Sequence, residues 1–115
     1  MLYEIKFKEN ILCKKAKIAK SFSDRLVGLM FKKHMKNFDG LLITQCNSIH
    51  TMFMRYKLDL IFLDKNLNVI KIIENIKPWR MTLMYFKSTQ VLELEGGSLN
   101  GSIQKGEQLE MKCIN

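Results

Sequence analysis

Residues 57–64, KLDLIFLD, form the most hydrophobic stretch of the chain, and this stretch contains a carboxylate between two leucines. Successive side chains of a strand point to opposite faces. One face of this segment therefore carries Leu58, Leu60 and Phe62, and the other carries Asp59, Ile61 and Leu63. A strand that is apolar on both sides is typical of the middle of a covered sheet. The segment therefore predicts a central strand with a buried aspartate.

Asp59 needs a partner in such a strand, because an unpaired buried carboxylate costs several kcal/mol or takes up a proton. Two of the three arginines are candidates: Arg25, in a predicted helix, and Arg55, just before the strand. We expect Arg25 and Asp59 to form a bidentate structural ion pair that holds the helix against the sheet.

Most of the remaining segments also have the alternation of a strand. They are residues 2–8, 11–20, 41–44, 50–54, 69–76, 90–95 and 108–114. Residues 22–30 differ, because their apolar positions recur with the period of a helix and Ser21 suits the N-cap. The sequence thus predicts a mainly β, α+β fold: a bent, β-barrel-like sheet with one clear short helix packed on it.

Length and composition limit the alternatives. The 115 residues suffice for a single domain, 1–115. No apolar run reaches the ~20 residues of a membrane span, and no secretory signal is visible, so we expect a cytoplasmic protein without a transmembrane segment. The net charge of +8 comes mainly from lysine. The scarcity of arginine argues against a nucleic-acid partner, because guanidinium groups make most specific contacts.

Six polar or aromatic residues from three segments predict a ligand site. They are His50, Thr51, Arg55, Trp79, Arg80 and Glu93. The only tryptophan stands between Lys77 and Arg80 in a proline-stiffened loop, which suits stacking on a ring or holding an anionic group. Trp79 could instead cover one end of the fold, and Glu93 could pair with Arg55 or Arg80. Met52, Met54, Met81 and Met84 are expected to fill the core.

Cys46 and His50 stand four residues apart and suggest two other kinds of site. A zinc site would need a second Cys or His pair, and none follows. A nucleophilic cysteine would need His50 in contact with it in space. We predict neither a metal nor a cofactor, and the three widely spaced cysteines suggest reduced thiols rather than disulfides.

An ordered set of motifs carries a family resemblance. The motifs are DRLVGLM, DGLL, HTMFMRYKLDLIFLD, VIKI, KPWR, VLELEGG and IQKGEQL, which together span about residues 22–109. The set resembles the domain-of-unknown-function family numbered 192. This resemblance implies a compact β-barrel-like fold with short helices and a family without an established activity. Many relatives look exported, whereas this chain shows no signal.

These observations support three functional hypotheses. The first is a small domain that binds a small polar or anionic ligand, or a short peptide, near His50, Arg55 and the KPWR loop. The second is a hydrolase or transferase that uses Cys46 and His50. The third is a basic module for nucleic acid or a membrane surface.

Overall fold

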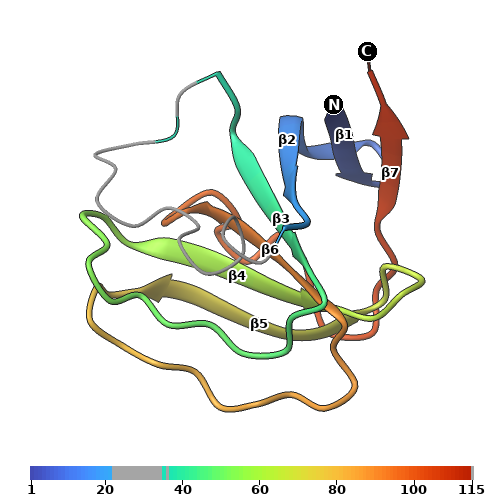
Figure 1. Ribbon diagram of the computed structural model, residues 1–115. Helices are drawn as coiled ribbons and strands as arrows, with labels where there is room; N and C mark the ends of the chain where they lie inside the picture. Colours follow the sequence, from blue (N-terminus) through green and yellow to red (C-terminus); the bar gives the residue numbers. More distant parts are fainter. Residues whose placement is uncertain (22–34, 36, 115) are drawn as a thin grey trace.

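The computed structural model describes residues 1–21, 35 and 37–114, and its regular elements are all strands. They are β1 (Leu2–Phe7), β2 (Asn10–Ala19), β3 (Gly40–Thr44), β4 (Leu58–Leu63), β5 (Val69–Ile76), β6 (Gln90–Glu95) and β7 (Glu110–Cys113). These strands form one sheet in the order β5-β4-β6-β3-β2-β1-β7. Figure 1 shows β1, β2 and β7 standing at a steep angle to β4 and β5, so the sheet is strongly twisted.

Most neighbouring strands run antiparallel, as expected for a chain of short hairpins. The exception in the described sheet is β2 with β3, a parallel pair in which Ala16 lies opposite Gly40 and Ala19 opposite Ile43. β1 pairs with β7, and the two chain ends lie side by side in Figure 1. The consecutive strands β1 and β2 form an antiparallel hairpin, and so do β4 and β5.

The predicted α+β class is wrong for the part of the chain that the structure describes. Every regular segment there pairs with a neighbouring strand, which makes the described fold all-β. The predicted short helix falls on residues 22–30, outside the described residues. The strand predicted at residues 50–54, which the structure does describe, is not formed, because a turn bond from Met54 N to Thr51 O and a positive φ at Phe53 interrupt the extended backbone.

β4 is buried along its whole length, as its sequence predicts. One face contributes Ile61 and Leu63 to a cluster with Leu92, Leu94 and Leu99. The other contributes Leu58, Leu60 and Phe62 to a second cluster with Leu41 and Val91. The sheet therefore has apolar side chains on both faces, and the loops that close its second face hold the candidate site.

Gly40 allows the close approach of β2 and β3. A methyl group added there would lie 2.5 Å from the Sγ of Cys13 and 3.1 Å from a methyl of Leu94. Cys13 is fully buried, so its side chain cannot move away easily. We expect Gly40→Ala to lower the free energy of unfolding by about 1–3 kcal/mol, measured by urea denaturation. The loss should shrink in a Cys13→Ala background; an equal loss in both backgrounds would refute this packing explanation.

Candidate functional site

Two long connections, residues 45–57 between β3 and β4 and residues 77–89 between β5 and β6, form the candidate site; we call them the paired loops. In Figure 1 they run next to each other along the lower side of the molecule. Backbone hydrogen bonds join them along their length: Cys46 N to Thr89 O (3.0 Å), Tyr85 N to Asn47 O (2.9 Å), Thr82 N to Ile49 O (2.9 Å), Thr51 N to Arg80 O (2.8 Å) and Trp79 N to Thr51 O (2.9 Å). Such a ladder fixes the two loops relative to each other.

Thr51 holds the two loops together from inside. Its side chain is fully buried, its hydroxyl donates to the Lys77 carbonyl at 2.7 Å, and it accepts from the Arg80 backbone N–H at 2.8 Å. The hydroxyl thus satisfies backbone groups of the opposite loop. In this structure Thr51 positions the neighbouring residues and is not exposed to a ligand.

An exposed aromatic pair lies at one end of the paired loops. The rings of Phe53 and Trp79 meet edge to face, with centroids 4.7 Å apart and an interplanar angle of 61°. Phe53 is 44% exposed and Trp79 is 54% exposed. Arg80 Nη1 donates to the Trp79 carbonyl at 3.3 Å. The sequence prediction of a tryptophan next to cations therefore corresponds to an exposed surface feature.

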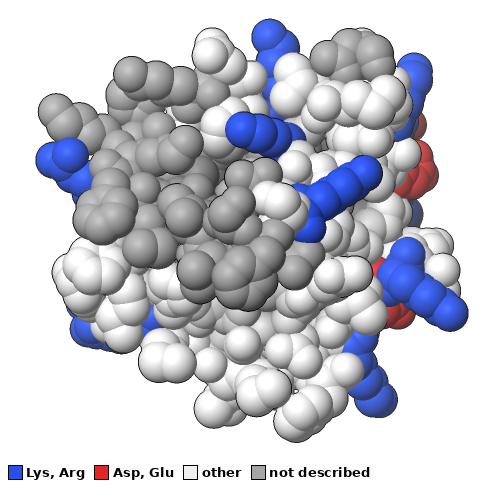
Figure 2. Space-filling view, viewed as in Figure 1, with Lys and Arg blue, Asp and Glu red and all other residues white. Residues whose placement is uncertain are grey.

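The surface of the paired loops has only positive formal charge. Neither loop contains Asp or Glu, and the exposed cations are Arg55, Lys57, Lys77, Arg80 and Lys87. In Figure 2 the lower edge of the molecule, where residues 77–88 run, shows no acidic side chain and has blue side chains on both sides. This edge can attract an anion.

Glu93 does not belong to this surface. It lies in the middle of β6, opposite Leu41 of β3 and Leu60 of β4, and is 4% exposed. Burial raises the pKa of its carboxyl group to about 8. Within the described part of the chain no ion pair joins Glu93 to Arg55 or Arg80, and both arginines are exposed.

The hydroxyl group of Tyr56 is also buried. Its pKa is raised, mainly by burial and further by the negative charges of Glu95 and Glu93.

Cys46 and His50 do not show the contact that a nucleophile and its base require. The Cys46 thiol donates to the Ser48 carbonyl at 3.0 Å. The Nδ1 of His50 is buried and has no hydrogen-bond partner, so this nitrogen does not accept a proton from Cys46. Among the described residues, no three His, Cys, Asp or Glu side chains come together as metal ligands would.

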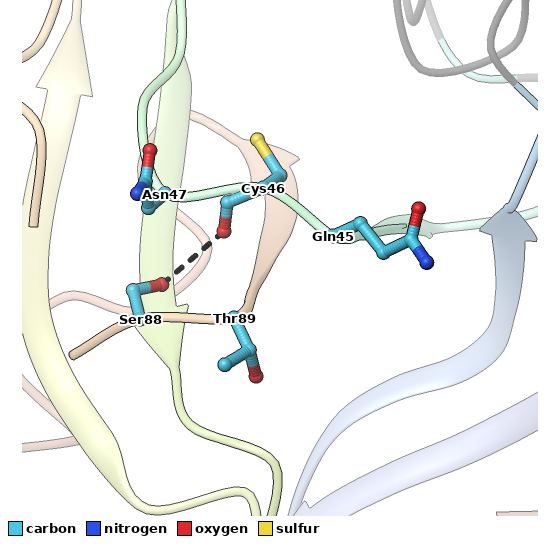
Figure 3. A pocket seen from close by; sticks show the side chains of 5 residues that line it. All are labelled: Gln45, Cys46, Asn47, Ser88 and Thr89. Atoms are coloured by element: carbon cyan, nitrogen blue, oxygen red, sulfur yellow. Dashed lines mark hydrogen bonds between the residues drawn. The ribbon is translucent and has the colours of Figure 1, made fainter. Parts of the chain in front are cut away.

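A hollow of about 340 Å³ lies at the other end of the paired loops. It is lined by Gln45, Cys46, Asn47, Ser88 and Thr89 (Figure 3). The Ser88 hydroxyl lies 3.0 Å from the Gln90 carbonyl and 3.2 Å from that of Leu63, so it is engaged with the backbone. The lining is uncharged. Sequence reasoning missed four of these five residues, because their only signal is a position just outside the ends of β3 and β6.

In the part of the chain that the structure describes, seven strands in one mixed sheet, with two bonded loops across one side, define a small β domain. The sequence identifies its family. The family described as "Uncharacterized ACR, COG1430", domain of unknown function 192, matches residues 4–111. The chain belongs to this family, as its ordered motifs indicate.

Two curated relatives are archaeal. UPF0127 protein PH1112 of Pyrococcus horikoshii is 40% identical over 80 residues, which cover 67% of this chain and 69% of the relative. UPF0127 protein PF1050 of Pyrococcus furiosus is 34% identical over 98 residues, covering 82% and 84%.

A crystal structure of a protein of unknown function from Novosphingobium aromaticivorans is similar to this chain with a TM-score of 0.80 and 19% identity, covering 96% of this chain and 84% of the other. At that identity the likeness shows the fold alone. In the described residues, no helix has the length and apolar character to cross a bilayer.

Proposed function

We propose that this domain is a binding module for a small anionic ligand, and that the ligand binds where Phe53, Trp79 and Arg80 meet. The observation that carries the proposal is an exposed aromatic pair beside cations, on two loops that contain no acidic residue. A ring face offers a stacking surface, and a guanidinium can bind a phosphate or carboxylate through two N–H groups.

The backbone ladder supports this proposal. Because Thr51 and the bonds between the loops already hold the backbone of Trp79 and Arg80, little backbone freedom remains to be lost on binding. The Arg80 guanidinium has five N–H donors, and its contacts to the Pro78 and Trp79 carbonyls involve Nη1 alone. The uncharged hollow at the other end of the paired loops fits an anion less well.

Trp79 gives a direct test, because it is the only tryptophan of the chain. We expect phenyl phosphate, which combines a ring with an anion, to change its fluorescence in a saturable way. Arg80→Ala should weaken this binding about tenfold, equivalent to about 1.4 kcal/mol. Lys105→Ala, an exposed cation outside the paired loops, serves as the matched control.

Two results would contradict the proposal. One is fluorescence that does not respond to millimolar phenyl phosphate. The other is an Arg80→Ala variant that binds as tightly as the unaltered chain while Lys105→Ala behaves identically.

A further inference from the structure

The paired loops also expose an unusual number of apolar side chains. Of the ten large hydrophobic residues exposed in the described structure, six belong to these loops. They are Phe53, Trp79, Met81, Leu83, Met84 and Phe86. The last four are 73%, 75%, 56% and 82% exposed, so they project from the surface. The prediction that these methionines fill the core is therefore wrong for Met81 and Met84, whereas Met54 is buried in the core.

Five exposed cations accompany this apolar ridge, residues 79–86, on the paired loops. Lys77 precedes it and Lys87 follows it, Arg80 lies within it, and the neighbouring loop adds Arg55 and Lys57. Exposed apolar and aromatic side chains together with lysine and arginine are the combination with which peripheral proteins enter an anionic lipid interface. Scattered exposed hydrophobic residues are ordinary, but six on one pair of loops form a patch.

We propose that the anionic group bound by the paired loops is a lipid headgroup, and that the domain docks on an anionic membrane surface with Trp79, Leu83 and Phe86 in the interface. This inference rests on the proposed function and names its ligand. A soluble anion would use Trp79 and Arg80 but leave Leu83 and Phe86 in water. A peptide ligand would need a groove, whereas these side chains project, and a projecting ridge fits a lipid layer.

Cosedimentation with lipid vesicles tests the inference. We expect the protein to bind vesicles of equal parts phosphatidylcholine and phosphatidylglycerol, to bind phosphatidylcholine alone at least tenfold more weakly, and to be released by salt. The double variant Leu83→Ser/Phe86→Ser should lose at least tenfold in vesicle binding and keep its binding of phenyl phosphate. Ile11→Ser/Met111→Ser, which alters exposed apolar residues on β2 and β7, should bind vesicles normally.

The outcomes separate the two proposals. Phenyl phosphate binding without vesicle binding overturns the membrane inference and leaves the proposed function standing; loss of both overturns both. Equal binding to the two vesicle types, or full binding by the Leu83/Phe86 variant, also overturns the inference. So does a dimer in light scattering that this variant dissociates, because the ridge would then be covered by a second copy. Both variants alter exposed side chains, so we expect them to fold, and thermal unfolding is the check.

Discussion

Replacing Asp59 with alanine is expected to lower the free energy of unfolding by about 3 kcal/mol or more. The carboxylate is fully buried in β4, and backbone N–H groups surround it. Its Oδ1 accepts from Asn75 at 2.8 Å and from Gly97 at 3.3 Å, and its Oδ2 accepts from Leu99 at 2.9 Å. Alanine would leave these donors without their acceptor in a site that it also leaves partly empty.

The position of these donors explains why the loss of stability should be large. The β4–β5 register shifts between Leu58 and Leu60, and Asn75 has a positive φ of 55°, so its N–H leaves the regular ladder and turns to Asp59. Gly97 and Leu99 belong to the turn after β6, and Leu99 is buried in the core cluster. One side chain therefore closes a β-bulge and anchors a turn.

Urea denaturation measures the effect, with Glu9→Ala, an exposed carboxylate in the β1–β2 turn, as the control. Asp59→Asn keeps one acceptor oxygen and should lose less stability than Asp59→Ala. A loss below about 1 kcal/mol for Asp59→Ala would contradict this interpretation.

The ion pair of Asp59 with Arg25 stays a prediction, since Arg25 lies outside the described residues. A double-mutant cycle tests it. If the pair forms, Arg25→Ala/Asp59→Ala should be no less stable than the worse single variant. Strictly additive losses would count against the pair.

The burial of Asp59 could be predicted from the sequence, but its acceptor role could not. The alternation in residues 57–64 requires apolar surroundings on both faces, and this local pattern is enough to bury the aspartate. Its donors are backbone N–H groups of Asn75, Gly97 and Leu99. Every residue but proline carries such a group, so no residue type in the sequence identifies which N–H groups will meet a carboxylate.

In the candidate site, too, the sequence identifies some residues and not others. Trp79 and Arg80 stand out by residue type and spacing, and the structure places both at the aromatic end of the paired loops. Leu83, Met84 and Phe86 give no such signal, because hydrophobic residues are usually buried. Backbone hydrogen bonds between the paired loops hold the segment in which these side chains are exposed. These hydrogen bonds join residues 28 to 43 positions apart, and local periodicity does not predict such pairings.

Glu93 is a candidate ligand contact from its sequence, but its burial in the structure makes stability depend on pH. The alternation of the strand places it on the same face of β6 as Val91. There the structure buries it between Leu41 of β3 and Leu60 of β4, its neighbours in the sheet. Burial raises the pKa of the carboxyl group from 4.5 in the unfolded chain to about 8. Between these values the folded state holds a proton that the unfolded state has released. Stability therefore falls as the pH rises through this window.

Glu93→Gln should remove this pH dependence, because an amide has nearly the shape of the protonated acid and does not ionise. We expect the variant to have nearly the stability of the unaltered chain at pH 5 and to exceed it by about 2 kcal/mol or more at pH 9. Urea denaturation at pH 5, 7 and 9 measures the difference in the free energy of unfolding between the variant and the unaltered chain. The other titrating groups are the same in both proteins, so their contributions cancel in this difference. Glu95→Gln, an exposed position on the same strand, serves as the matched control. If the stability of Glu93→Gln follows that of the unaltered chain in parallel across this range, the carboxyl group titrates alike in both states, and its burial does not oppose ionisation.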